Sequence, residues 1–236
     1  MFFGLFSNKI SLADCNLLKG FTDWHCHLLP GVDDGVKTME ESLQILSLYE
    51  QLGVSEVWCT PHIMEDVPNT TSFLKNRFAA LKTAYTGSIQ LNLAAENMLD
   101  CLFEERLEVD DLLPIGDSGK HLLVETSCFS PPINLYELLI RIQKHGYIPI
   151  LAHPERYYYM ESNEYSRLKE KGVKFQLNLL SLCGGYGSEI QSKANRLLNM
   201  KCYDFIGTDV HRTAMFQRII QSKLTNKQIL KIKDIK

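Results

Sequence analysis

The sequence lacks the features of a membrane protein, of a secreted protein and of a protein that binds nucleic acid. No run approaches the roughly 20 apolar residues that a membrane-spanning helix needs. The apolar start, with Phe2, Phe3, Leu5 and Phe6, is too short for a signal-peptide core, and we expect it to pack on the domain surface. The net charge is only −3, which argues against nucleic acid or an anionic membrane as the main partner.

No linker, internal repeat or low-complexity tract interrupts the 236 residues. We therefore expect a single domain over residues 1–236, with its motifs between about 21 and 212. The last residues, from about 223, are basic and amphipathic, and their simplest interpretation is a solvated helix end.

The cysteines lack the spacing of a disulfide framework or of a metal-binding pair. They number seven, lie far apart and include no Cys-x-x-Cys. Such a pattern is typical of reduced thiols, so we expect a cytoplasmic protein. The signatures Cys-x5-Arg, Gly-x-Ser-x-Gly and the Walker A loop are also absent. These absences argue against a cysteine phosphatase and against the other common nucleophile and phosphate-loop chemistries.

The sequence does contain an alternation of short apolar runs and helical patterns. The predicted strands are 21–26, 54–60, 89–96, 121–126, 148–153, 173–178 and 204–209. The predicted helices are 38–52, 70–84, 98–109, 134–145, 162–171, 189–200 and 212–222. This α/β alternation predicts a parallel sheet. An open doubly wound sheet would fit, but a closed or nearly closed barrel fits better, because polar residues recur at one end of most strands.

The first predicted strand ends in a pair of histidines, His25 and His27. Side chains at i and i+2 of a strand point to the same face. Two imidazoles side by side suit a transition metal. Taken alone, however, the pair is explained equally well as two polar residues at a strand end, since His-x-His is a common motif.

The ends of the other predicted strands favour the metal. Six of the seven apolar runs terminate in His, Glu or Asp, and charged groups gathered at a barrel mouth cost free energy unless something pairs them. Divalent metals would pair them. The candidate ligands are His25, His27, His62, Glu96, Glu125, His153, Asp209 and His211, together with Asp34 or Asp33 in the loop after the first strand. Spacing alone does not choose between the two aspartates.

Nine ligands, counted with one aspartate, are too many for one ion, which takes roughly four to six. Two or three ions that share bridging carboxylates would use them all. Three divalent ions and four carboxylates leave a surplus charge of about +2, which a phosphate dianion complements. Mixed nitrogen and oxygen ligands favour manganese, zinc or iron over magnesium or calcium. The remaining histidines, His121 and His145, are expected to be structural.

This ordered set of motifs resembles the polymerase and histidinol phosphatase (PHP) superfamily. The string from His25 to Gly35 and the string from Ala152 to Tyr157 are more specific, and they look like the bacterial capsule-type protein-tyrosine phosphatases of that superfamily. The resemblance implies a distorted seven-stranded β/α barrel with a trinuclear, usually manganese-using, site, and it places the ligand on Asp34. It also implies action on phosphotyrosine of a bacterial tyrosine kinase that controls exopolysaccharide export.

The expected chemistry is hydrolysis of a phosphomonoester with metal-bound hydroxide as the nucleophile. Arg156 is expected to clamp the phosphate, and a salt bridge with Glu155 or another acid is the alternative. His62 or His211 could also move a proton. Arg212 is the nearest candidate for a second phosphate-binding arginine, unless it belongs to the final predicted helix.

Two other functions remain open at this point. One is a small-molecule PHP phosphatase, such as one that acts on histidinol phosphate. The other is a catalytically silent metal-binding partner of a polysaccharide-export complex. The complete ligand set argues against the silent protein, and the glycine- and aspartate-rich loop that contains Asp34 favours the tyrosine phosphatase.

Overall fold

The computed structural model describes residues 9–235 as an alternation of strands and helices, and the expectation for Phe2, Phe3, Leu5 and Phe6 lies outside that range. The strands are β1 (Lys9–Ser11), β2 (Thr22–Cys26), β3 (Glu56–Cys59), β4 (His62–Ile63), β5 (Gln90–Leu93), β6 (Glu96–Met98), β7 (His121–Glu125), β8 (Ile148–Ala152), β9 (Lys174–Asn178), β10 (Phe205–Gly207) and β11 (Lys223–Thr225). The helices are α1 (Met39–Gln51), α2 (Thr71–Ala84), α3 (Cys101–Glu108), α4 (Leu135–Lys144), α5 (Ser162–Glu170), α6 (Leu179–Leu182), α7 (Ser188–Asn199), α8 (Thr213–Gln221) and α9 (Asn226–Lys233), with a short 3₁₀ turn, η1, at Pro154–Arg156.

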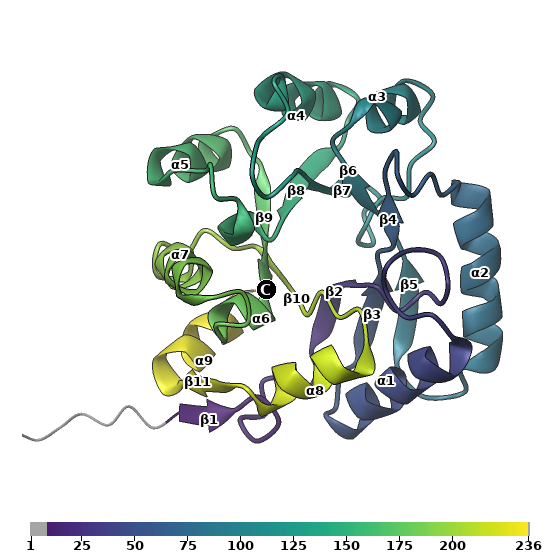
Figure 1. The fold of residues 1–236 in the computed structure, drawn as a ribbon, viewed down its shortest axis with the longest axis vertical. Coiled ribbons are helices and arrows are strands. Elements are labelled where there is room, and N and C mark those ends of the chain that lie inside the picture. Colours follow the sequence, from purple (N-terminus) through teal and green to yellow (C-terminus); the bar gives the residue numbers. More distant parts are fainter. Residues whose placement is uncertain (1–8, 236) are drawn as a thin grey trace, which may run out of the picture.

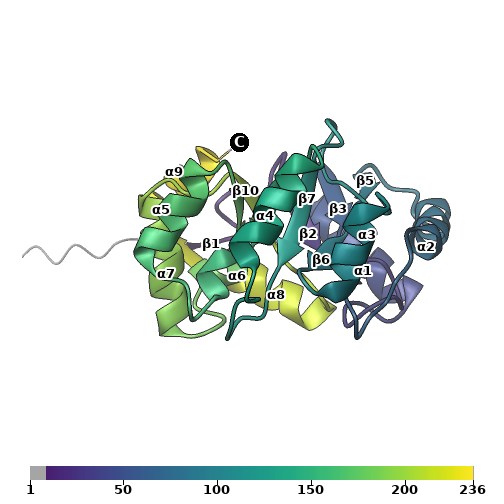
Figure 2. The ribbon, with the colours of Figure 1, turned by 90° about the horizontal axis from the view of Figure 1, so that it is seen from above.

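The two larger sheets are parallel, as the alternation predicts. One has the strand order β10-β9-β8-β7-β6-β4 and the other the order β2-β3-β5. Strands β1 and β11 form a separate antiparallel ribbon. The helices surround the curled strands (Figure 1). In the view turned by 90° the strands stand between α7 on one side and α2 on the other (Figure 2).

Backbone hydrogen bonds join the smaller sheet to the larger one where the end of β2 meets the end of β10: Asp209 N donates to His25 O at 2.7 Å, and His27 N donates to Val210 O at 2.9 Å. On the other side the chain itself passes from one sheet to the other, from β3 to β4 and from β5 to β6. The parallel strands therefore curl around a common interior, and their carboxyl ends meet on one side of it.

Two predicted strands end differently in the structure. The predicted strand 54–60 is β3, and a further strand that was not predicted, β4, follows after Thr60 and Pro61. Proline has no N–H to donate to a ladder, and at this point the chain passes from the smaller sheet to the larger one. The predicted strand 89–96 is broken at the same level, so that Glu96 begins β6 instead of ending the preceding strand.

Two further predictions need correction near helix termini. The helix predicted from residue 98 begins at Cys101, because the side chain of Asp100 accepts a hydrogen bond from Phe103 N and caps it there. The basic C-terminal segment is not a solvated helix end. It forms β11 and α9, and it buries Leu224 and Ile232 in the core.

A small apolar cluster lies inside the curled strands, apart from the main core beneath the helices. It contains Trp58, Ala94, Ile115, Leu123, Ile150 and Ala152, with Trp24 and Phe205 packed against them. Leu123 lies two residues before Glu125 on β7 and so points to the same face. The cluster therefore forms an apolar floor beneath the strand ends. Among residues 9–235, no helix is both long and apolar enough to cross a lipid bilayer.

Candidate metal centre

Donor atoms from the strand ends converge at one side of the curled sheet. In each of three groups the ligand atoms lie within 4.8 Å of one another: His25, His27, Glu96 and Asp209; His62, Glu96 and Glu125; and His27, Asp34, His62 and His211. His153 adjoins the second group, with its Nε2 at 3.0 Å from a Glu96 oxygen and 3.7 Å from a Glu125 oxygen. The structure thus brings all nine predicted ligands together.

Glu96 lies at the centre of the cluster. Its Oε2 is 3.1 Å from His25 Nε2, 3.2 Å from His27 Nε2 and 3.2 Å from His62 Nδ1. Its side chain is buried, and its other oxygen faces His153. A carboxylate that faces four imidazoles with two oxygens is placed to bridge metal ions.

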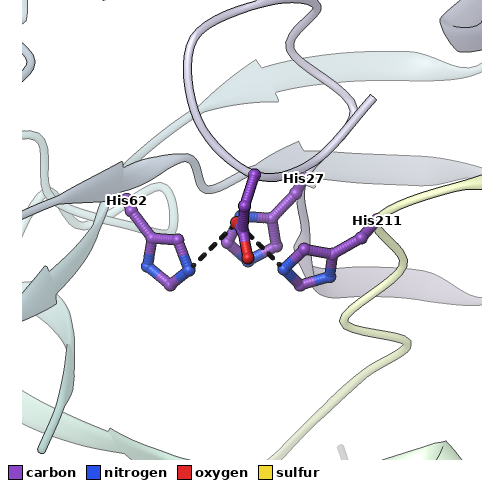
Figure 3. A group of neighbouring side chains, drawn as sticks. His27, His62 and His211 are labelled. Carbon is purple, nitrogen blue, oxygen red and sulfur yellow. Dashed lines mark ion pairs between the residues drawn. The ribbon is translucent and has the colours of Figure 1, made fainter. Parts of the chain in front are cut away.

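The structure separates the roles of the two neighbouring aspartates. Asp34 Oδ1 lies 3.5 Å from His62 Nε2 and 3.4 Å from His211 Nε2, and the rings of His27, His62 and His211 converge around it (Figure 3). Asp33 Oδ2 instead accepts a hydrogen bond from His27 Nδ1 at 2.8 Å. This geometry favours Asp34 as a ligand, and Asp33 as the group that orients the His27 ring.

A glycine allows this loop to close over the site. A Cβ on Gly35 would lie only 2.4 Å from the His27 carbonyl oxygen, and the Gly35 N–H donates to Asp33 Oδ1 at 2.9 Å. Any larger residue would push the loop away from β2. Gly35 therefore holds both aspartates beside the histidine pair.

Two amides on β9 that were not predicted as site residues also hold the ligands. Gln176 Oε1 lies 2.9 Å from His25 Nδ1 and accepts a hydrogen bond from His153 N at 3.2 Å. Asn178 Nδ2 donates to Asp209 Oδ2 at 2.8 Å. The available signal was a pair of amides that alternate with the apolar Phe175 and Leu177 on this strand. Buried amides of this kind need partners, and here the partners are metal-ligand candidates.

A buried carboxylate, also missed, fixes the ends of β2 and β10. Asp23 accepts hydrogen bonds from Thr208 Oγ1 at 2.6 Å, Thr208 N at 2.9 Å and His25 N at 3.2 Å. Tyr49 donates to it as well. Burial raises the pKa of Asp23, although these hydrogen bonds oppose the rise. The network ties together the two strand ends that carry His25 and Asp209.

Two candidate ligands have strained backbones. His153 has φ of 32° and Asp209 has φ of 54°, both in the left-handed region that non-glycine residues rarely adopt. Such conformations cost free energy and persist only where the surroundings enforce them. Here they turn both side chains into the cluster as the chain leaves β8 and β10.

Opposite charges shift the pKa values of the clustered groups. Burial alone would lower the pKa of His25, but the charges of Glu96 and Asp209 raise it to about 9. Burial would raise the pKa of Glu96, but His25 and His62 hold it well below its usual range. The hydrogen bond with His211 lowers the pKa of Asp34. The imidazoles and carboxylates are thus arranged as complementary groups, and an imidazole must be deprotonated before it can bind a cation.

Buried ligand atoms test whether the residues fit a metal. Among residues 9–235, His62 Nδ1, Glu125 Oε1 and His153 Nδ1 are buried without a hydrogen-bond partner. The first two lie 3.0 Å apart, yet their geometry is not that of a hydrogen bond. A buried polar atom without a partner is costly. Two such atoms that face one another, beside a set of imidazoles and carboxylates, fit a shared divalent cation.

Arg156 forms a salt bridge with Asp209 and not with Glu155, the acid named first in the alternative from sequence. Its Nη1 donates to Asp209 Oδ2 at 3.0 Å, and its guanidinium lies 4.7 Å from the centre of the Tyr186 ring. Glu155 is instead buried and accepts hydrogen bonds from Asn178 N and Tyr203 Oη, each at 3.0 Å. Arg156 therefore borders the cluster at its Asp209 side.

The other sequence candidates lie outside the three groups of ligand atoms. Arg212 is exposed at the start of α8, in line with the alternative that it belongs to that helix. His121 begins β7, at the end of the strand opposite Glu125, and its ring contacts Phe205 edge-on. His145 caps α4 and lies 3.8 Å from a carboxylate oxygen of Glu108.

Comparison with known sequences identifies the family. Residues 21–229 match the model of the family described as Capsular polysaccharide synthesis, CpsB/CapC. The chain belongs to the CpsB/CapC family. Among its relatives, the tyrosine-protein phosphatase YwqE of Bacillus subtilis is 29% identical over 202 residues, which is 80% of this chain and 76% of the relative. The tyrosine-protein phosphatase CpsB of Streptococcus pneumoniae is 31% identical over 154 residues, which is 63% of this chain and 62% of that protein.

A solved structure supports the fold of this CpsB/CapC chain. It comes from crystal structures of YwqE from Bacillus subtilis and CpsB from Streptococcus pneumoniae, described as unique metal-dependent tyrosine phosphatases. The match has a TM-score of 0.77 at 23% sequence identity, and it covers 91% of this chain and 86% of the other. The curled parallel sheet is thus shared with proteins that carry the same family name.

Proposed function

We propose that this chain is a metal-dependent protein-tyrosine phosphatase in capsule or exopolysaccharide synthesis. One observation carries the proposal: nine histidine and carboxylate side chains converge at the strand ends in a chain of the CpsB/CapC family. The relatives named as tyrosine-protein phosphatases support the reaction. The substrate that we infer is phosphotyrosine on a bacterial tyrosine kinase, and the location is the cytoplasm.

We infer two or three divalent ions, with manganese favoured over zinc or iron. The three overlapping groups of ligand atoms support this number, and the position of Glu96 supports a bridge between ions. We also propose that the curled sheet is a distorted seven-stranded PHP barrel within a single domain. The backbone hydrogen bonds between the ends of β2 and β10, and the two chain segments that pass from one sheet to the other, support that interpretation.

Divalent ions in such a site supply hydroxide near neutral pH and neutralise phosphate charge. The protein orients the imidazoles through Asp33, which holds His27, and Gln176, which holds His25. The apolar floor excludes water beneath them. Because most imidazoles would be occupied by metal, few groups are left to protonate a leaving group. Tyrosinate, with a conjugate-acid pKa near 10, needs less of that help than a serine alkoxide.

Phosphotyrosine peptides should be hydrolysed at least tenfold faster, in kcat/KM, than matched phosphoserine peptides. The assay compares peptides that differ only at the phosphorylated residue and includes histidinol phosphate. A kcat/KM that is tenfold higher for histidinol phosphate would instead support a small-molecule phosphatase. A kcat/KM that is tenfold higher for phosphoserine would support a phosphatase of broader specificity. Absence of turnover on every substrate, with metal bound, would support a silent metal-binding protein.

Replacing Arg156 with alanine should lower kcat/KM for phosphotyrosine peptides by about ten- to a hundredfold, because a charge-assisted contact to phosphate is lost. Metal content should stay near that of the wild type, because Asn178 still holds the Asp209 oxygen that Arg156 contacts. Steady-state kinetics and elemental analysis check both expectations. The matched control is Arg167→Ala on α5, which removes an arginine stacked at the same 4.7 Å on a tyrosine ring. Equal losses in both variants would refute the phosphate role.

A further inference from the structure

An exposed apolar surface borders the metal centre at the same end of the strands. Phe129 is 78% exposed, Tyr158 43% and Ile133 fully exposed. The rings of Phe129 and Tyr158 stack with centroids 5.6 Å apart and an angle of 11° between their planes. We call Phe129 and Tyr158 the rim platform. Large apolar side chains that cluster on a surface, rather than occurring singly, mark an interaction site.

The rim platform is held in place from beneath. Tyr158 N donates to Cys128 O at 2.8 Å, which ties the loop after β7 to the segment after η1. Lys193 Nζ donates to Tyr157 O at 2.9 Å and lies 5.8 Å from the centre of the Tyr158 ring. Pro131 and Pro132 restrict the loop that follows Phe129. A preformed surface loses little conformational entropy when it binds a partner.

Both segments of the rim platform begin at residues of the metal centre. The loop that carries Phe129 follows Glu125, and Tyr158 lies two residues after Arg156. Cys128, next to Phe129, lies near enough to the metal centre for its charges to act on the thiol. Burial raises the pKa of the Cys128 thiol, the charge of Arg156 opposes the rise, and the charge of Glu125 adds to it. The platform is thus continuous with the centre and not a remote patch.

We propose that the rim platform binds the residues that flank phosphotyrosine in a peptide substrate. This inference rests on the proposed function. When the phosphate of a phosphotyrosine lies at the metal centre, the backbone of the peptide must run across the rim. There the stacked rings can pack against an aromatic or aliphatic side chain next to the phosphotyrosine in the peptide. The ammonium of Lys193 at the platform edge complements acidic or phosphorylated residues further along the same segment. The platform thereby favours a protein segment over a small phosphate ester.

The test compares Phe129→Ala with the wild type on three substrates. These are a phosphotyrosine peptide with leucine and tyrosine neighbours, the same peptide with glycine neighbours, and p-nitrophenyl phosphate. The variant should raise KM about tenfold for the first peptide, with kcat unchanged and the other two substrates unaffected. Val109→Ala is the matched control, because Val109 is 73% exposed just after α3. It should change none of these values.

Three other outcomes would overturn the inference. An unchanged KM for the first peptide would remove the platform from substrate binding. An equal loss on all three substrates would show that Phe129 acts only through the loop that holds Glu125. A change in oligomeric mass by light scattering, with peptide kinetics intact, would make the platform a contact between copies of this chain. If the wild type cleaves p-nitrophenyl phosphate but no phosphotyrosine peptide, the proposed function itself fails and the platform inference with it.

Discussion

Removal of divalent metal should abolish phosphatase activity, and added Mn²⁺ should restore it. The loss should be on the order of a thousandfold or more, because no side chain replaces the activated water and the charge neutralisation that the ions supply. The structural reason is the composition of the centre, in which imidazoles and carboxylates converge on shared points. The measurement is phosphate release from a phosphotyrosine peptide after dialysis against chelator, followed by addition of individual metals.

Thiol chemistry provides the control for this prediction. Cys26 and Cys59, the thiols nearest the histidines in sequence, are buried, and burial raises the pKa of Cys26 well above its usual range. Brief alkylation should therefore leave most of the activity intact. If alkylation inactivates the enzyme quickly while the chelator has no effect, the metal mechanism is wrong.

Metal should also stabilise the folded chain. A ligand that binds only the native state raises the free energy of unfolding in proportion to the logarithm of its concentration over its dissociation constant. The melting temperature should therefore rise with added Mn²⁺ and fall after chelation. This readout needs no substrate, so it tests the metal centre independently of the reaction that we propose.

Replacing Glu96 with glutamine should have the largest effect of any single isosteric change. Glu96 faces His25, His27 and His62 through one oxygen and His153 through the other. Glutamine keeps the shape but removes the charge and turns one ligand oxygen into an N–H₂ donor. Changes to groups that merely orient ligands cost about 10- to 100-fold, so loss of a bridging ligand should exceed a hundredfold in kcat/KM. Elemental analysis should show fewer ions bound per chain.

The matched control is Glu104→Gln on α3, which removes a half-exposed carboxylate that pairs with Arg141 at the surface. A surface ion pair contributes little, so activity and metal content should be unchanged. Far-UV circular dichroism should confirm that the Glu96 variant still folds. A folded Glu96→Gln protein with full metal content and near-normal turnover would show that Glu96 does not bridge metal ions.

The strand-end pattern predicted that these side chains would lie close together, and the structure brings them together for a physical reason. In a curled parallel sheet the carboxyl ends of all strands lie at one rim, so residues far apart in sequence are brought together by topology alone. His25, Glu125 and Asp209 share no local sequence context, yet each follows or ends an apolar run. Local patterning could not place the breaks before β4 and β6, because they depend on which sheet each half of the strand joins.

The sequence by itself determined the parallel α/β alternation and the residue types of the candidate centre, because these follow from the succession of short apolar runs and from the polar residues at their ends. Spacing alone left Asp33 and Asp34 open, and only the tertiary structure shows that their side chains point in different directions, Asp33 towards His27 and Asp34 towards His62 and His211. It alone also paired Arg156 with Asp209 and not with Glu155. Such choices depend on side-chain directions and on partners distant in sequence, and a one-dimensional pattern does not contain them.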